Sequence, residues 1–129
     1  MIQRLNRKAI GDEAEALACD YLSQRGLNLL TRNYRCRGGE IDLIMFDQDC
    51  LVFVEVRYRA SEAFGRASDT VDYRKQCKII RTAALYVAHN PGLGSHTMRF
   101  DVFAIEGCKD TDYRMTWIKD AFRPNNSTL

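Results

Sequence analysis

The sequence predicts an α/β domain with a mixed central sheet flanked by helices. Three observations lead to this class: an amphipathic helical segment near the N-terminus, a second one in the middle of the chain, and several short segments of strong β character around it. The expected order is α-β-β-β-α-β-β. The 129 residues suit one domain, so we expect a single domain over 1–129, with a core over 6–122 and a frayed polar tail over 123–129.

The first helix is expected over residues 6–25, with Asn6 as its cap and Gly26 ending it in a left-handed turn. Its apolar side repeats with helical periodicity and consists of Ile10, Ala14, Leu17, Ala18, Tyr21 and Leu22. This side should pack against the sheet.

The second helix is expected over residues 69–89. Ser68 or Asp69 can cap it, and Asp72 would then lie in its first turn, where the helix dipole favours negative charge. Its apolar side consists of Val71, Ile80, Ala83, Ala84 and Val87.

Five segments have the composition of strands: 27–34, 40–46, 51–58, 98–105 and 114–119. The first two are separated by the turn over 35–39, which contains two glycines. The second and third are joined tightly enough for a hairpin with a turn at Gln48 and Asp49. Residues 59–68 are polar and are expected to form a mobile loop.

This hairpin brings two carboxylates together. Pairing Phe46 with Leu51 and counting back places Asp42 opposite Glu55, on the face away from Leu43, Met45 and the other apolar residues. Ile41, Val52, Val54 and Val56 are expected to share that apolar face. Directly opposed residues have Cβ atoms roughly 4.5–5.5 Å apart, and like charges there repel. A divalent cation offsets that repulsion, and Mg²⁺ or Mn²⁺ suits oxygen ligands.

Two simpler arrangements compete with a metal site. A slip of one residue in register would put the carboxylates on opposite faces. Alternatively, their face could be the solvent-exposed side of an antiparallel sheet. Ile44 and Phe53 lie on the same face and argue against full exposure.

The composition excludes several other classes. No apolar run approaches the ~20 residues of a membrane helix, and the basic residues of segment 1–10 precede no apolar stretch, so neither a membrane protein nor a secretory signal is expected. The five cysteines are odd in number and form no C-x-x-C, which predicts free thiols in the cytoplasm. His89 and His96 have no metal-ligand spacing. The net charge is only +2, but most basic residues are arginines, which suit phosphate oxygens.

The sequence also resembles a known family. The motifs are Gly39-Glu-Ile-Asp-Leu-Ile44, Phe53-Val-Glu-Val-Arg57, Arg99-Phe-Asp-Val102 and Ala121-Phe122, with Gly11-x-x-Ala-Glu15-x-x-Ala18 near the start. In this order they are similar to the YraN-like family of small bacterial proteins, over residues 8–122. The resemblance implies the restriction-endonuclease-like PD-(D/E)XK nuclease fold, similar to archaeal Holliday-junction resolvases.

Three acidic residues match the metal site of that superfamily. Asp42 matches the Asp that begins one central strand, and Glu55 matches the Glu of Glu-x-Lys on the next. Glu15 matches a Glu that the first helix often contributes. It falls at the edge of the apolar arc of the helix, from which it can reach the sheet or stay in solvent.

One basic residue departs from the pattern. Arg57 stands where the superfamily usually has lysine, and a guanidinium cannot act as a general base, although it can stabilise transition-state charge. Alternatively, Arg57 could pair with Glu40 across the strands. Lys75 in the second helix could supply the missing ammonium, and with Lys78 it matches a basic patch of the family; a solvated helix face is the simpler reading of both.

The expected function is Mg²⁺-dependent (or Mn²⁺-dependent) cleavage of phosphodiester bonds, with DNA favoured over RNA and branched DNA as one candidate. Asp42, Glu55, Arg57 and Lys75 would be the catalytic residues. The arginines at 32, 35, 37 and 59, together with Lys78, would contact the nucleic acid, and the loop over 59–66 could close over it. Junction resolvases of this fold work as dimers, so a homodimer is compatible with the resemblance. The alternatives are a nucleic-acid-binding module without catalysis and an interaction scaffold without nucleic acid.

Overall fold

The computed structural model describes residues 7–60, 71–107 and 112–125. It is an α/β fold in which a five-stranded mixed sheet is flanked by two helices, in the predicted order. The elements are α1 (Arg7–Gln24), β1 (Asn28–Cys36), β2 (Gly39–Asp47), β3 (Cys50–Arg59), α2 (Tyr73–His89), a short 3₁₀ helix (Pro91–Leu93), β4 (Thr97–Glu106) and β5 (Arg114–Phe122). The predicted mixed fold is confirmed.

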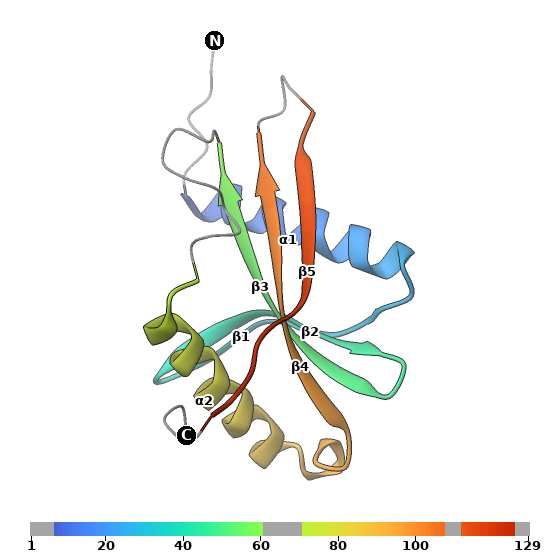
Figure 1. Ribbon diagram of the computed structural model, residues 1–129, viewed down its shortest axis with the longest axis vertical. Coiled ribbons are helices and arrows are strands. Elements are labelled where there is room, and N and C mark those ends of the chain that lie inside the picture. The colour runs from blue at the N-terminus through green and yellow to red at the C-terminus, as the bar shows by residue number, and fades with distance from the viewer. Residues whose placement is uncertain (1–6, 61–70, 108–111, 126–129) are drawn as a thin grey trace.

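The strands lie in the sheet in chain order, from β1 to β5. Neighbours are antiparallel except β3 and β4, which are parallel. Parallel strands need a crossover connection, and α2 lies in the connection between these two. Figure 1 shows the hairpin of β1 and β2 running steeply across β3, β4 and β5, so the sheet is strongly twisted near its centre.

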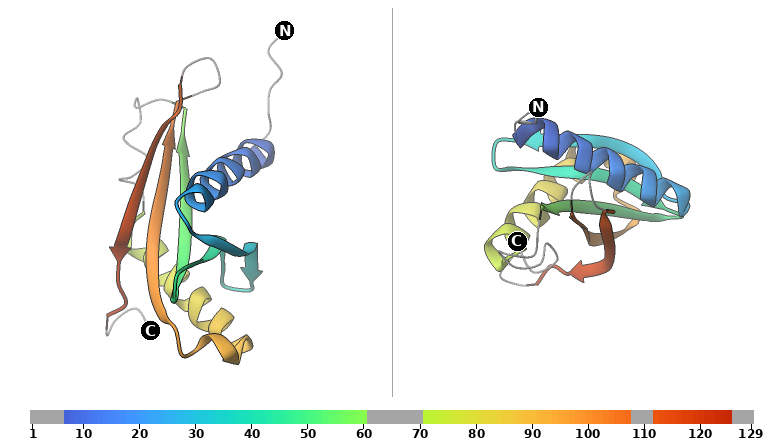
Figure 2. Two further views of the ribbon diagram at one scale, coloured as in Figure 1. Left: turned by 90° about the vertical axis from the view of Figure 1, so that its right-hand side faces the viewer. Right: turned by 90° about the horizontal axis from the view of Figure 1, so that it is seen from above.

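Each helix covers its own apolar layer on the sheet (Figure 2). The α1 layer contains Ala14, Ala18, Leu22, Leu27, Leu43, Met45, Val52, Val54, Phe103 and Ile105. The α2 layer contains Ile41, Ile44, Leu51, Phe53, Ile79, Ile80, Ala83, Tyr86, Phe100, Val102 and Phe122. Burial of apolar side chains on both faces therefore fixes the central strands between the two helices.

The hairpin of β2 and β3 has the predicted register. Ile44 pairs with Phe53 and Phe46 with Leu51, and the turn places Gln48 at φ +55°. The register slip weighed above is therefore excluded.

Several boundaries differ from the prediction. Helix α2 begins at Tyr73, because Asp72 is its cap and accepts a hydrogen bond from the Lys75 backbone N–H at 2.8 Å. The predicted caps Ser68 and Asp69 lie outside the described residues, as do most of the predicted mobile loop and the end of the tail. Strand β5 continues to Phe122, because a bulge lets the chain pair again with β4 after residue 118.

Neither described helix combines the length and apolar character needed to cross a membrane. Cys19, Cys36, Cys50 and Cys77 are free thiols, as predicted, and Cys108 lies outside the described residues.

Candidate active site

Strands β2 and β3 separate at the position of the two predicted carboxylates. Their pairing ends with Leu43 and Val54, although both strands continue beyond it. The next residue of β2, Asp42, accepts the backbone N–H of Val56 on its Oδ2 at 2.8 Å. The Asp42 carboxylate thus accepts the Val56 N–H, which a backbone carbonyl would accept in a regular ladder. The predicted neighbours Asp42 and Glu55 therefore lie one residue beyond the last paired residues, Leu43 and Val54.

The alternation of side chains along β2 also changes at this point. Ile41 was expected on the face of Leu43 and Met45, but it packs in the α2 layer beside Ile44. That expectation was wrong, because residues two apart share a face only in a regular strand. The pairing of β1 with β2 is interrupted opposite Asp42, between the pairs Arg32–Leu43 and Tyr34–Ile41.

Three carboxylates are buried around the separation. The exposed fractions of Asp42, Glu55 and Glu15 are 8%, 5% and 9%. Burial, with the nearby negative charge of Glu55, raises the pKa of Asp42 to about 8, despite the hydrogen bond from Val56. Burial also raises the pKa of Glu15. Side-chain interactions with Asn33 and Asp42 and the positive charge of Arg32 lower this pKa and partly offset the effect of burial. The Glu15 side chain therefore extends from α1 to the sheet, where it lies close to Asp42.

Two cations approach Glu55. The Lys75 Nζ lies 2.9 Å from Glu55 Oε1, and the Arg57 Nη1 lies 3.5 Å from the same oxygen. Lys75 comes from the first turn of α2, so the helix brings an ammonium to a strand carboxylate 20 residues earlier in the chain. Glu40, the alternative partner of Arg57, forms an ion pair with Arg35 at 3.2 Å.

The donor chemistry of this cluster fits a hard divalent cation. Carboxylate oxygens are the ligands that Mg²⁺ prefers, and Glu15 Oε1 is buried without a hydrogen-bond partner. Over the described ranges 7–60, 71–107 and 112–125, no three acidic, cysteine or histidine side chains converge into a complete ligand set. The cluster thus offers Asp42 and Glu55 as a pair, with Glu15 beside Asp42.

A groove of about 500 Å³ lies next to this cluster. It is lined by Gly39, Glu40, Asp72, Arg74, Lys75, Lys78 and Ile79, from the start of β2 and the first turns of α2. Gly39 makes the close approach of α2 possible, because a Cβ there would lie 2.7 Å from Thr82 Oγ1. Lys75 belongs to both groove and cluster, so the groove leads to Glu55.

The predicted nucleic-acid contacts are distributed unevenly. Lys78 is exposed in the groove, and Arg35 lies near its rim through its ion pair with Glu40. Arg37 is exposed in the turn between β1 and β2, whereas Arg32 is close enough to Glu15 to affect its pKa. Arg59 is half-buried at the end of β3, and the rest of the predicted closing loop, 61–66, lies outside the described residues.

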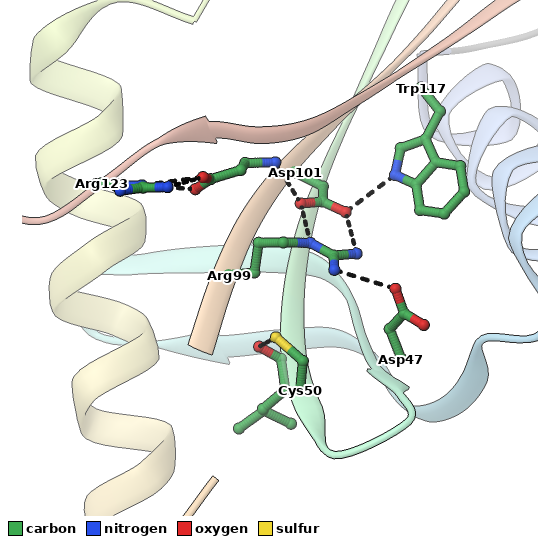
Figure 3. Close-up of polar contacts among 8 residues, drawn as sticks. Asp47, Cys50, Arg99, Asp101, Trp117 and Arg123 are labelled. Carbon is green, nitrogen blue, oxygen red and sulfur yellow. Dashed lines mark hydrogen bonds and ion pairs between the residues drawn. The ribbon is translucent and has the colours of Figure 1, made fainter. Parts of the chain in front are cut away.

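Sequence reasoning missed a second buried carboxylate centre, drawn in Figure 3. Asp101 has no exposed surface and accepts two hydrogen bonds from the Arg99 guanidinium, at 2.9 and 3.0 Å. The Trp117 indole N–H and the Asp120 backbone N–H complete its partners, each at 2.9 Å. Arg99 also pairs with Asp47 at 3.0 Å, so the centre joins the β2–β3 turn to β4 and β5. The signal was the Arg99-x-Asp101 motif.

Fold and site together define an α/β domain whose mixed sheet holds two buried carboxylates where two strands separate, with a third, from α1, beside them. The chain belongs to the uncharacterised protein family UPF0102, whose profile matches residues 14–105, which confirms the family resemblance. A UPF0102 protein of Pseudomonas putida (strain GB-1) is 47% identical over 112 residues, 87% of this chain and 91% of the relative. One from Pseudomonas syringae pv. syringae (strain B728a) is 46% identical over 94% of this chain and 98% of its own. One from Nitrosococcus oceani (strain ATCC 19707) is 50% identical over 88% and 90%.

Proposed function

We propose that this protein is a Mg²⁺- or Mn²⁺-dependent endonuclease that hydrolyses phosphodiester bonds in DNA. One observation carries the proposal: Asp42 and Glu55 are buried where β2 and β3 separate, and Lys75 and Arg57 both approach Glu55. A buried acid with a strongly shifted pKa beside a groove, as Asp42 is, is typical of a functional site. The PD-(D/E)XK resemblance of the same residues agrees with this chemistry.

The proposed roles follow from the positions of the side chains. Asp42 and Glu55 would hold the ion, with Glu15 as a third ligand. The bound ion would polarise the scissile phosphate and lower the pKa of a bound water. A guanidinium cannot act as a general base, so the part of Arg57 is to stabilise negative charge on the phosphate. Lys75 can do the same or move a proton.

The groove beside Glu55 suits a phosphate-containing strand. Arg74, Lys75 and Lys78 line it, and Arg35 lies at its rim, so a backbone passing through would meet cations on one side. Arg37 and Arg59 would extend the contacts on either side of the site. The same groove would accept branched or linear DNA. A homodimer would be able to bind either substrate.

The alternative is a nucleic-acid-binding module without catalysis. It is favoured by the two cations on Glu55 Oε1, which already compensate one carboxylate without a metal ion. Such a module would bind DNA equally well with and without divalent ions.

The decisive experiment incubates the protein with Mg²⁺ or Mn²⁺ and a panel of branched and linear DNA and RNA substrates. We expect cleavage that is lost on adding a chelator and in the variant Asp42→Asn. Asp49→Asn is the matched control, because Asp49 is exposed in the β2–β3 turn, away from the site. If the wild type binds DNA but does not cleave it, the binding module without catalysis is favoured. If it does not bind DNA at all, the remaining candidate is an interaction scaffold without nucleic acid.

A further inference from the structure

One residue of β1 has an unusual backbone conformation opposite the site. Asn33 has φ +53°, in the left-handed region that side chains other than glycine rarely adopt. The other two described non-glycine residues with positive φ have local explanations. Gln48 lies in the β2–β3 turn, and Asp120 lies in the β5 bulge, where its N–H binds Asp101. Asn33 lies inside a strand, so its conformation needs a different explanation.

The conformation of Asn33 coincides with the irregularity of β2 around Asp42. The register of β1 and β2 passes from Arg32–Leu43 to Tyr34–Ile41 and omits Asn33 and Asp42 between them. On β2 the same position separates Leu43, in the α1 layer, from Ile41, in the α2 layer. The two strands therefore deviate together, and the deviation frees Asp42 to reach Val56.

The side chain of Asn33 also takes part in the carboxylate cluster. Its amide interacts with the Glu15 carboxylate and lowers the pKa of that group, as does the interaction of Glu15 with the Asp42 side chain. Only the amide NH₂ of asparagine can donate to a carboxylate. Asn33 thus approaches the Glu15 carboxylate, whose Oε1 stays buried without a hydrogen-bond partner.

We infer that Asn33 is a positioning residue of the metal site, which holds Glu15 against Asp42 so that the free oxygen of Glu15 can serve a divalent cation. This inference rests on the proposed function. Residues that orient metal ligands by hydrogen bonding commonly change metal affinity or activity by 10–100-fold when they are replaced. Asn33 does so from a backbone conformation that asparagine tolerates better than most residues.

The test compares Asn33→Gly with Gln48→Gly. Glycine adopts a positive φ readily, so both variants should fold. The two variants are matched because each replaces one non-glycine residue in the left-handed region by glycine. Mg²⁺ and Mn²⁺ are titrated while thermal unfolding is followed, since an ion that binds only the folded state raises its stability. We expect Asn33→Gly to need about 10–100-fold more metal for the same stabilisation. Gln48→Gly should match the wild type.

A double variant separates positioning from a general effect on the fold. If Asn33 acts through Glu15, then Asn33→Gly should weaken metal binding no further once Glu15→Gln is present. Additive losses would show that Asn33 acts independently of Glu15 and would overturn the inference, as would wild-type affinity in Asn33→Gly. If the wild type itself binds neither metal, the proposed metal site fails as well, and this inference fails with it.

Discussion

Two buried aspartates on central strands of the same sheet have opposite surroundings. Asp101 has no exposed surface and accepts four hydrogen bonds, two of them from the Arg99 guanidinium. Asp42 is 8% exposed, accepts one backbone N–H and lies near the charges of Glu55 and Glu15. The charge of Asp101 is compensated by its hydrogen-bond donors, whereas Asp42 lies beside two other carboxylates.

This difference separates a structural acid from a functional one. A buried carboxylate with complete hydrogen bonding and a bidentate arginine has its charge compensated by these partners, and it ties its neighbours together. A buried carboxylate beside other carboxylates has its pKa raised and is unfavourable in the ionised state until a proton or a cation arrives.

The largest effect is expected at the structural centre. Asp101→Asn should lower the free energy of unfolding by about 3–5 kcal/mol, because it removes the charge of a fully buried carboxylate and leaves the half-buried Arg99 without its main partner. Urea unfolding measures the change, and divalent ions should not alter it. Arg123→Ala is the control: its ion pair with Asp120 is on the surface, and the melting temperature should stay unchanged. A loss at Asp101 no larger than at Arg123 would contradict the structural role.

The next effect concerns the cations on Glu55. Arg57→Ala should reduce the cleavage rate on the order of 100-fold, because it removes one preorganised charge beside the phosphate. Arg57→Lys keeps a charge and restores the usual superfamily residue, so its activity should survive or rise. If Arg57→Ala cleaves as fast as the wild type, the guanidinium is only a structural partner of Glu55.

Asp42 should make the metal-free protein less stable as pH rises. Its folded pKa of about 8 lies above the unfolded value of ~4, so the folded state binds more protons between these limits and stability falls across that window. Asp42→Asn removes the slope while an amide oxygen can still accept from Val56. The variant should match the wild type near pH 4 and exceed it by roughly 1–3 kcal/mol near pH 8. Saturating Mg²⁺ should flatten the wild-type curve; equal slopes in both metal-free proteins would refute the shift.

The sequence predicted the fold and the acidic pair because both depend on local patterns. Alternation and a two-residue turn were enough to set the register of Ile44 with Phe53 and hence to bring Asp42 near Glu55. They could not predict that the ladder ends at Leu43, because this depends on Asp42 competing with the backbone for the Val56 N–H. The twist at Asn33 and the buried partners of Asp101 likewise depend on tertiary contacts with α1 and β5.

The smallest effect concerns the groove. Its Lys78 is exposed, whereas Arg99 is fixed by ion pairs with Asp47 and Asp101. Lys78→Ala should reduce the slope of log K against log salt for DNA binding by about one, since each phosphate contact contributes roughly that much. Replacing Lys75 as well should lower it further, although Lys75 is also the partner of Glu55 and its loss should affect cleavage too. Arg81→Ala is the matched control, because Arg81 is exposed on the same helix but does not line the groove. If the slopes of Lys78→Ala and Arg81→Ala are the same, the groove does not carry the strand, and the phosphate path must lie along the arginines of β1 and β3 instead.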